Sequence, residues 1–129
     1  MATTEYMTSQ TYSATIGGVV YNVSASLGAV ASAAWPAATA AADDTSPTVL
    51  GVNILYLPAN TVATVITQLD GGVSNQVVTL ICTSSTNSST ITNGGNFLLS
   101  ASWSPQVNDT LLLTTANGTT WRELARSNN

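Results

Sequence analysis

The chain has 129 residues, of which 44% are hydrophobic and only 6% charged, and its net charge is −4. This length suffices for one domain, or for a small domain with an arm, and not for two full domains. Arg122 and Arg126 are the only basic side chains, and the chain has no His and a single Cys. A nucleic-acid partner is disfavoured because there is no basic patch. A zinc site lacks ligands, and Ser-His or Cys-His catalysis is excluded because His is absent.

The chain also lacks the apolar segments that membranes and secretion require. No apolar run reaches the ~18 residues of a membrane span, and residues 1–6 lack the charged and apolar regions of a signal peptide. We therefore expect a soluble protein made in a cytoplasm, with no membrane contact, metal or cofactor. Cys82 cannot form an intrachain disulfide, so stability is expected from packing or oligomerisation.

Residues 1 to 46 predict an N-terminal arm that is rich in Ala, Ser and Thr. Residues 28–42 contain nine Ala, which favours a short helix from about Ser24 to Ala34 that Pro36 would end. The pattern from Gly17 to Val23 favours a strand. Two interpretations remain open for the arm, a flexible segment or a segment that orders against a partner.

Residues 47 to 129 predict a β-rich module. Turn signals such as Asp70-Gly71-Gly72 and Asn117-Gly118 separate short apolar runs. These runs predict strands at residues 49–57, 62–69, 76–83, 90–92, 97–103, 110–115 and 119–124. Short strands at such close spacing favour a small sandwich, barrel or prism.

Several of these runs are apolar on both faces, for example Ile54–Leu57 and Leu111–Leu113. A module of this size would expose too much apolar surface as a monomer, so we expect a subunit interface to cover the second face. The alternative is a two-layer sandwich that buries one face of each sheet. The residues expected in the core or at the subunit interface are Ile54, Tyr56, Val77, Ile81, Leu99, Leu111, Leu113 and Trp121.

The acidic and aromatic residues offer only weak candidate sites. Asp43-Asp44 is an adjacent pair without the further oxygen ligands of a calcium loop. Asp70 and Asp109 lie in turn contexts, where Asp is favoured for its own backbone hydrogen bonds, so a glycosidase pair is disfavoured. Trp103 and Trp121 could stack on a sugar, although a core or interface position is favoured. Arg122, Glu123 and Arg126 are expected to form ion pairs within or between subunits.

Residues 47 to 127 contain motifs that carry a family resemblance. They resemble the small β-rich module at the C-termini of bacteriophage tail-spike, tail-fibre and head-fibre proteins. The most specific matching parts are Asp70-Gly71-Gly72 followed by Gln76-Val77-Val78-Thr79-Leu80, and Leu111-Leu112-Leu113 with Trp121, Glu123 and Arg126. The resemblance implies a homotrimer whose strands pack around a threefold axis and which carries no catalytic residues of its own.

The resemblance leads to an expected function. We expect a non-enzymatic phage virion structural protein, a trimeric capsid decoration or head-fibre protein. The alternative is a short tail-fibre tip that binds a host cell-surface glycan, and a secreted lectin or adhesin is disfavoured because a signal peptide is missing. The arm is expected to attach to the major capsid protein or another virion protein through spaced aromatic anchors, Tyr6, Tyr12, Tyr21 and Trp35.

Overall fold

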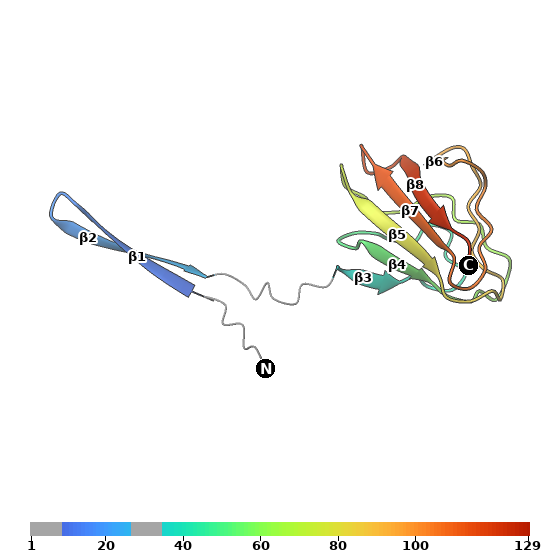
Figure 1. The fold of residues 1–129 in the computed structure, drawn as a ribbon, viewed down its shortest axis with the longest axis horizontal. Coiled ribbons are helices and arrows are strands. Elements are labelled where there is room, and N and C mark those ends of the chain that lie inside the picture. The colour runs from blue at the N-terminus through green and yellow to red at the C-terminus, as the bar shows by residue number, and fades with distance from the viewer. Residues whose placement is uncertain (1–8, 27–34) are drawn as a thin grey trace. The chain divides into compact units, whose positions relative to one another are not determined.

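A long β-hairpin opens the part of the chain that the computed structural model describes, residues 9–26 and 35–129. Its strands are β1 (Ser9–Ile16) and β2 (Val19–Ser26), which pair antiparallel along their whole length (Figure 1). The turn between them is made by Gly17 and Gly18, both with positive φ. The chain divides into two units, of which the first contains the hairpin and the second, Trp35–Asn129, is called the module here.

A six-stranded mixed sheet organises the module (Figure 1). Its spatial order is β3-β4-β5-β7-β8-β6; the first three strands run parallel to one another, and β7 is antiparallel to both of its neighbours. The strands are β3 (Ala37–Thr39), β4 (Ile54–Leu57), β5 (Val77–Cys82), β6 (Phe97–Leu98), β7 (Thr110–Thr115) and β8 (Trp121–Ser127). The regular elements of the described residues are all strands, so the mainly β class is confirmed.

The N-terminal half of the module is built from successive layers of chain, here called rungs, that stack in parallel. The stacking is seen in the sheet, where Ala37, Ile54 and Thr79 occupy one register row. It continues outside the sheet in two isolated parallel bridges, Thr48 with Asp70 and Val65 with Thr90. Each rung therefore pairs with the next both in a strand and in a connecting loop, as in repeat proteins whose units contact only their neighbours.

A ladder of polar side chains joins the rungs at one turn. Asp43 and Asn60 lie 17 positions apart, and the Asp43 N–H donates to Asn60 Oδ1 at 2.7 Å. Asn60 Nδ2 in turn donates to the carbonyl of Asn87 and to Ser89 Oγ, at 2.7 and 2.9 Å. Asp43 Oδ1 also accepts the Thr61 N–H at 2.8 Å. Asn60 is only 4% exposed, so these bonds satisfy a buried amide and fix the rungs in register.

The hydrophobic core lies between the sheet and the long connections that follow β4 and β5. Its largest side chains are Trp103, Trp121 and Phe97, each at most 1% exposed. Two turns, at Gly72 and Gly118, approach each other closely beside this core. A Cβ on Gly118 would lie 2.5 Å from the carbonyl oxygen of Gly72, so side chains are excluded there.

The boundary between arm and module lies earlier than predicted. The module begins at Trp35, whereas the sequence placed its start at Pro47. Strand β3 completes the edge of the sheet, Ala38 and Ala40 pack against the core, and Asp43 belongs to the polar ladder. The small side chains of β3 and its neighbours carry little apolar signal, so the sequence alone does not distinguish them from the arm.

Two expected elements are also corrected. The helix expected from Ser24 to Ala34 is wrong at its start, because residues 24–26 continue β2, and its remainder lies outside the described residues. The strand expected over 62–69 is reduced to the single bridge at Val65. Thr64 and Ile66 do point inward, so the alternation in the sequence reports burial without a continuous ladder.

Candidate functional site

One face of the six-stranded sheet carries the core, and the opposite face is covered by no other part of the module. The long connections that follow β4 and β5 lie on the core side (Figure 1). The uncovered side, here called the open face, consists of half-buried residues that alternate with the core residues along β4, β5 and β7. They are Ile54, Tyr56, Val77, Thr79, Ile81, Thr110, Leu112 and Thr114.

Strand register arranges these side chains in rows. One row runs Ile54, Thr79 and Leu112 across three strands, and the next runs Tyr56, Ile81 and Thr110. Each row mixes large apolar side chains with threonine, a combination that fits a pleated surface and supplies hydroxyl groups for hydrogen bonds. No charged residue lies among the eight, and the neighbouring charge on this side of the sheet is Arg122 of β8, which pairs with Thr114. A partner can therefore cover the eight without burying a charge if Arg122 stays at the rim of the contact.

The residues expected in the core or at a subunit interface divide between the two faces. Four of them, Ile54, Tyr56, Val77 and Ile81, lie on the open face. The other four, Leu99, Leu111, Leu113 and Trp121, lie in the core and are at most 8% exposed within a single chain. Only the first group therefore lies on a side of the sheet that another chain could contact.

The acidic residues of the described chain all serve as hydrogen-bond acceptors that hold backbone or neighbouring side chains. Asp43 accepts from Thr61 and Val62, and this bonding lowers its pKa, the Thr61 hydroxyl being the main cause. Asp109 accepts the N–H groups of Gln106 and Asn129 at 2.8 and 2.7 Å, which also lowers its pKa.

Asp44 and Asp70 complete the pattern with short-range bonds. The Ser46 N–H donates to Asp44 Oδ1, and Gln68 Nε2 donates to Asp70 Oδ1. Within the described residues no three His, Cys, Asp or Glu side chains gather into a group that could hold a metal ion.

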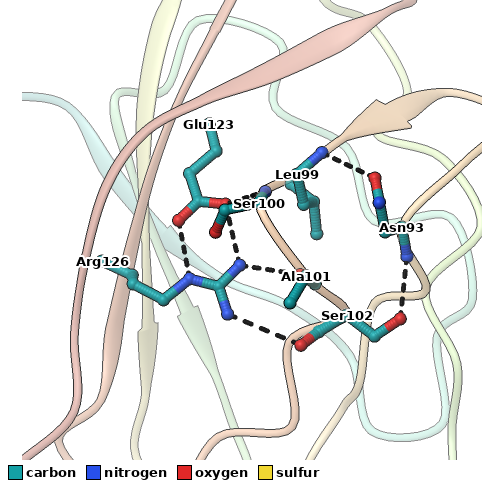
Figure 2. Close-up of polar contacts among 7 residues, drawn as sticks. All are labelled: Asn93, Leu99, Ser100, Ala101, Ser102, Glu123 and Arg126. Atoms are coloured by element: carbon teal, nitrogen blue, oxygen red, sulfur yellow. Dashed lines mark hydrogen bonds and ion pairs between the residues drawn. The ribbon is translucent and has the colours of Figure 1, made fainter.

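Glu123 and Arg126 form a clamp that fixes the chain after β6 onto β8 (Figure 2). Arg126 binds the carboxylate through Nε and Nη2, at 2.6 and 2.8 Å. The same carboxylate accepts the N–H of Ser100 at 2.7 Å, and Arg126 Nη2 donates to the carbonyl of Ala101 at 2.7 Å. The Arg126 guanidinium, helped by Ser100, lowers the pKa of Glu123 to about 2. The expected ion pair thus forms within one chain, between Glu123 and Arg126.

The two candidate sugar-stacking residues are not available to a ligand. Trp103 and Trp121 are at most 1% exposed, and their indole nitrogens have no protein acceptor. Two shallow hollows lie nearby on the loop side of the module, with volumes of about 240 and 290 Å³. Asn96 lines both hollows, and the smaller also includes Gln68, Asp70 and Thr119. The smaller hollow can offer hydrogen bonds and no exposed aromatic ring.

The structure describes three of the four residues that are expected to attach the protein to the virion. Trp35 is 64% exposed at the start of the module. Tyr12 lies in β1, where it pairs with Val23, and Tyr21 lies in β2, where it pairs with Ala14. Tyr6 lies outside the described residues.

The single cysteine lies in the interior of the module. Cys82 is buried, burial raises the pKa of its thiol, and Sγ donates to the carbonyl of Ser84 at 3.1 Å. Along the described stretches, 9–26 and 35–129, the chain forms no helix of the length and hydropathy needed to cross a membrane.

Comparisons with protein-family models, curated proteins and solved structures found no match for the chain.

Proposed function

We propose that the chain is a non-enzymatic structural protein of a phage virion, a homotrimeric capsid decoration or head-fibre protein. The open face of the sheet is the observation that carries this proposal. Its residues on β4, β5 and β7 are apolar or threonine, nothing else in the module covers them, and the charge of Arg122 lies beside them on β8. The sequence resemblance to trimeric modules of phage spikes and fibres supplies the virion context.

A second and third copy of the same face are suitable covers for it. The face spans β4, β5 and β7, so Ile81 and Leu112 lie near its middle, with threonines beside them. Burial of apolar side chains stabilises association by ~25 cal/mol per Å² removed from water. Threonine hydroxyls can form hydrogen bonds across such an interface without the cost of burying a charge.

Attachment to the particle is proposed to use the N-terminal region, with the major capsid protein or another virion protein as the partner. Within the described residues Trp35 supports this role, because a large aromatic side chain that is 64% exposed is a typical binding anchor. The described carboxylates, tied to backbone and side-chain donors, support the non-enzymatic part of the proposal.

Light scattering of the full chain tests the trimer. We expect a mass of three chains at micromolar concentration, and a shift to monomers for Ile81→Glu, which places a charge in the middle of the open face. The matched control is Val73→Glu, because Val73 is 56% exposed on a loop outside the sheet. A wild-type monomer at micromolar concentration would contradict the proposal, and so would an Ile81→Glu trimer that is as stable as the control.

A second candidate function is a short tail-fibre tip that binds a host glycan. The smaller hollow favours it, because Gln68, Asp70, Asn96 and Thr119 present amide, carboxylate and hydroxyl groups that suit sugar hydroxyls. A glycan array distinguishes the two candidates, since a pure decoration protein should bind none of the glycans. Imaging of particles that carry the labelled protein would then distinguish a head position from a tail position.

A further inference from the structure

The register of the N-terminal hairpin separates apolar from hydroxyl-bearing positions. Directly paired residues share one face of a two-stranded ribbon, and successive pairs alternate between the faces. The pairs of one face are Gln10 with Ala25, Tyr12 with Val23, Ala14 with Tyr21 and Ile16 with Val19. The pairs of the other face are Ser9 with Ser26, Thr11 with Ser24, Ser13 with Asn22 and Thr15 with Val20.

A ribbon with this pattern needs a cover for its apolar face. An isolated two-stranded hairpin is marginally stable in water, because it has no second layer to bury its apolar side chains. At the turn end of the hairpin, Val19 of this face is 53% exposed and Val20 of the other face 60% exposed. A partner surface is therefore expected to pack on this apolar face.

The lack of charged residues in this part of the sequence restricts which partner can pack on the apolar face. Between Glu5 and Asp43 the sequence contains no charged residue, so nothing in this segment selects a charged partner or opposes contact with an identical segment. An eight-residue ribbon measures roughly 27 Å by 10 Å, which is small beside the ~800 Å² per partner of a stable interface. Such a face can be held only by a partner that is already kept close.

Other copies of the chain are kept close in this way once the module has trimerised. Ser26 is eleven residues from Ala37 in β3, a stretch that spans at most roughly 40 Å. Tethers of this length give local concentrations on the order of millimolar, far above those of a partner in free solution. The most available cover for each hairpin is thus the same hairpin of a neighbouring copy.

We propose that the three hairpins pack against one another through their apolar faces and form a second self-association element N-terminal to the module. This inference rests on the proposed trimer and extends it. It assigns Tyr12 and Tyr21 to contacts between copies, and it leaves Trp35 for contact with the virion. The opposite, hydroxyl-rich face is suited to face water.

Single cysteines in the full chain test the packing, in a background where buried Cys82 is replaced by Ala. Ala14→Cys lies on the apolar face, and the matched control Ser13→Cys lies next to it on the hydroxyl face. We expect mild oxidation to link Ala14→Cys into covalent dimers within the trimer, independently of protein concentration. We expect at least a tenfold lower yield for Ser13→Cys.

Hydrogen exchange gives a second measurement that requires no cross-link. Tyr21→Glu places a charge on the apolar face, and Asn22→Glu places the same charge on the hydroxyl face. Amides of β1 and β2 should lose protection in Tyr21→Glu and keep it in Asn22→Glu. Equal loss in both variants would overturn the packing.

The outcomes separate this inference from the proposed function. If the full chain is a trimer and Ala14→Cys stays reduced, or links no better than Ser13→Cys, the hairpin packing is overturned and the trimeric function survives. If the full chain is a monomer, both are overturned. If the chain is a trimer and only Ala14→Cys links, both are supported.

Discussion

The two faces of the module's sheet differ far less in sequence than in surroundings. On the core side, Leu80 and Leu111 are completely buried, while their neighbours Ile81 and Leu112 on the open face are only half-buried. All four are large aliphatic residues on adjacent strands. The difference arises because the long connections after β4 and β5 fold back over one side of the sheet alone. Apolar residues on both faces of a strand therefore predict that both faces will be buried, and the chain's own loops bury only one of them.

The largest expected effect on the stability of the module comes from two truncations of the chain. A chain that starts at Trp35 should fold, because it keeps the whole sheet and its core cover. A chain that starts at Pro47 loses β3 and Asp43, which exposes the edge of β4 and leaves Asn60 with fewer partners. We expect the shorter chain to lose its cooperative thermal transition, measured by circular dichroism. Equal melting of the two chains would show that residues 35–46 do not stabilise the module.

Two adjacent leucines in β7 test the two faces directly. Leu111→Ala on the core side should destabilise the module by about 2–5 kcal/mol, because it removes transfer free energy and leaves a cavity. Leu112→Ala on the open face should cost about 1 kcal/mol in the monomer, and more when the trimer forms. Denaturant unfolding at several protein concentrations measures both effects. A Leu112→Ala effect that is independent of concentration would argue against an interface on the open face.

Polar residues of the two sides provide a smaller contrast. Asn60→Ala removes the donor to Asn87 and Ser89 and the acceptor for Asp43, so we expect a loss of about 1–3 kcal/mol. Thr79→Ala on the open face should change the stability of the monomer by roughly 0.5 kcal/mol or less. The same unfolding measurement compares them, and a larger effect for Thr79 would reverse the assignment.

The smallest expected effect is a dependence on pH at β8. The pKa of Glu123 is lowered to about 2 in the folded chain, from an ordinary value near 4.5. Its stabilising contribution is therefore complete above about pH 4.5 and is lost as the pH falls toward 2. Glu123→Gln should lower the melting temperature at pH 7 and flatten its decline over that range. Arg122→Gln, at an exposed position in the same strand, serves as the control and should leave the decline unchanged.

The sequence predicted the β class and the strands that have strong local signals. The segments 77–82 and 110–115 alternate around β-branched and leucine residues, and the structure confirms both as strands. Burial of Trp103 and Trp121 was the favoured interpretation of the two indoles and is also confirmed. These features depend on side chains that are close together in the sequence or that have few alternatives.

The parallel stacking of rungs was not predicted, for a physical reason. It depends on contacts between residues such as Asp43 and Asn60 or Asn60 and Asn87, which lie 17 and 27 positions apart. The two intervals are unequal, so no fixed period is visible in the chain. Positive φ at Asp43 and Asn87 marks the turns that these contacts join, and recurrence of Asp or Asn before small polar residues was the only available signal.

Stacked rungs also constrain how the length of such a chain can change. Neighbouring strands in a sheet lie about 4.8 Å apart, so insertion of one complete rung would move everything beyond it by that distance along the stacking direction. A partial insertion would instead place ladder positions such as Asn60 opposite the wrong backbone groups. Length variation in the parallel half of the module should therefore come in whole rungs, while variation at the Asn117-Gly118 turn between β7 and β8 is limited by the close contact of Gly118 with Gly72.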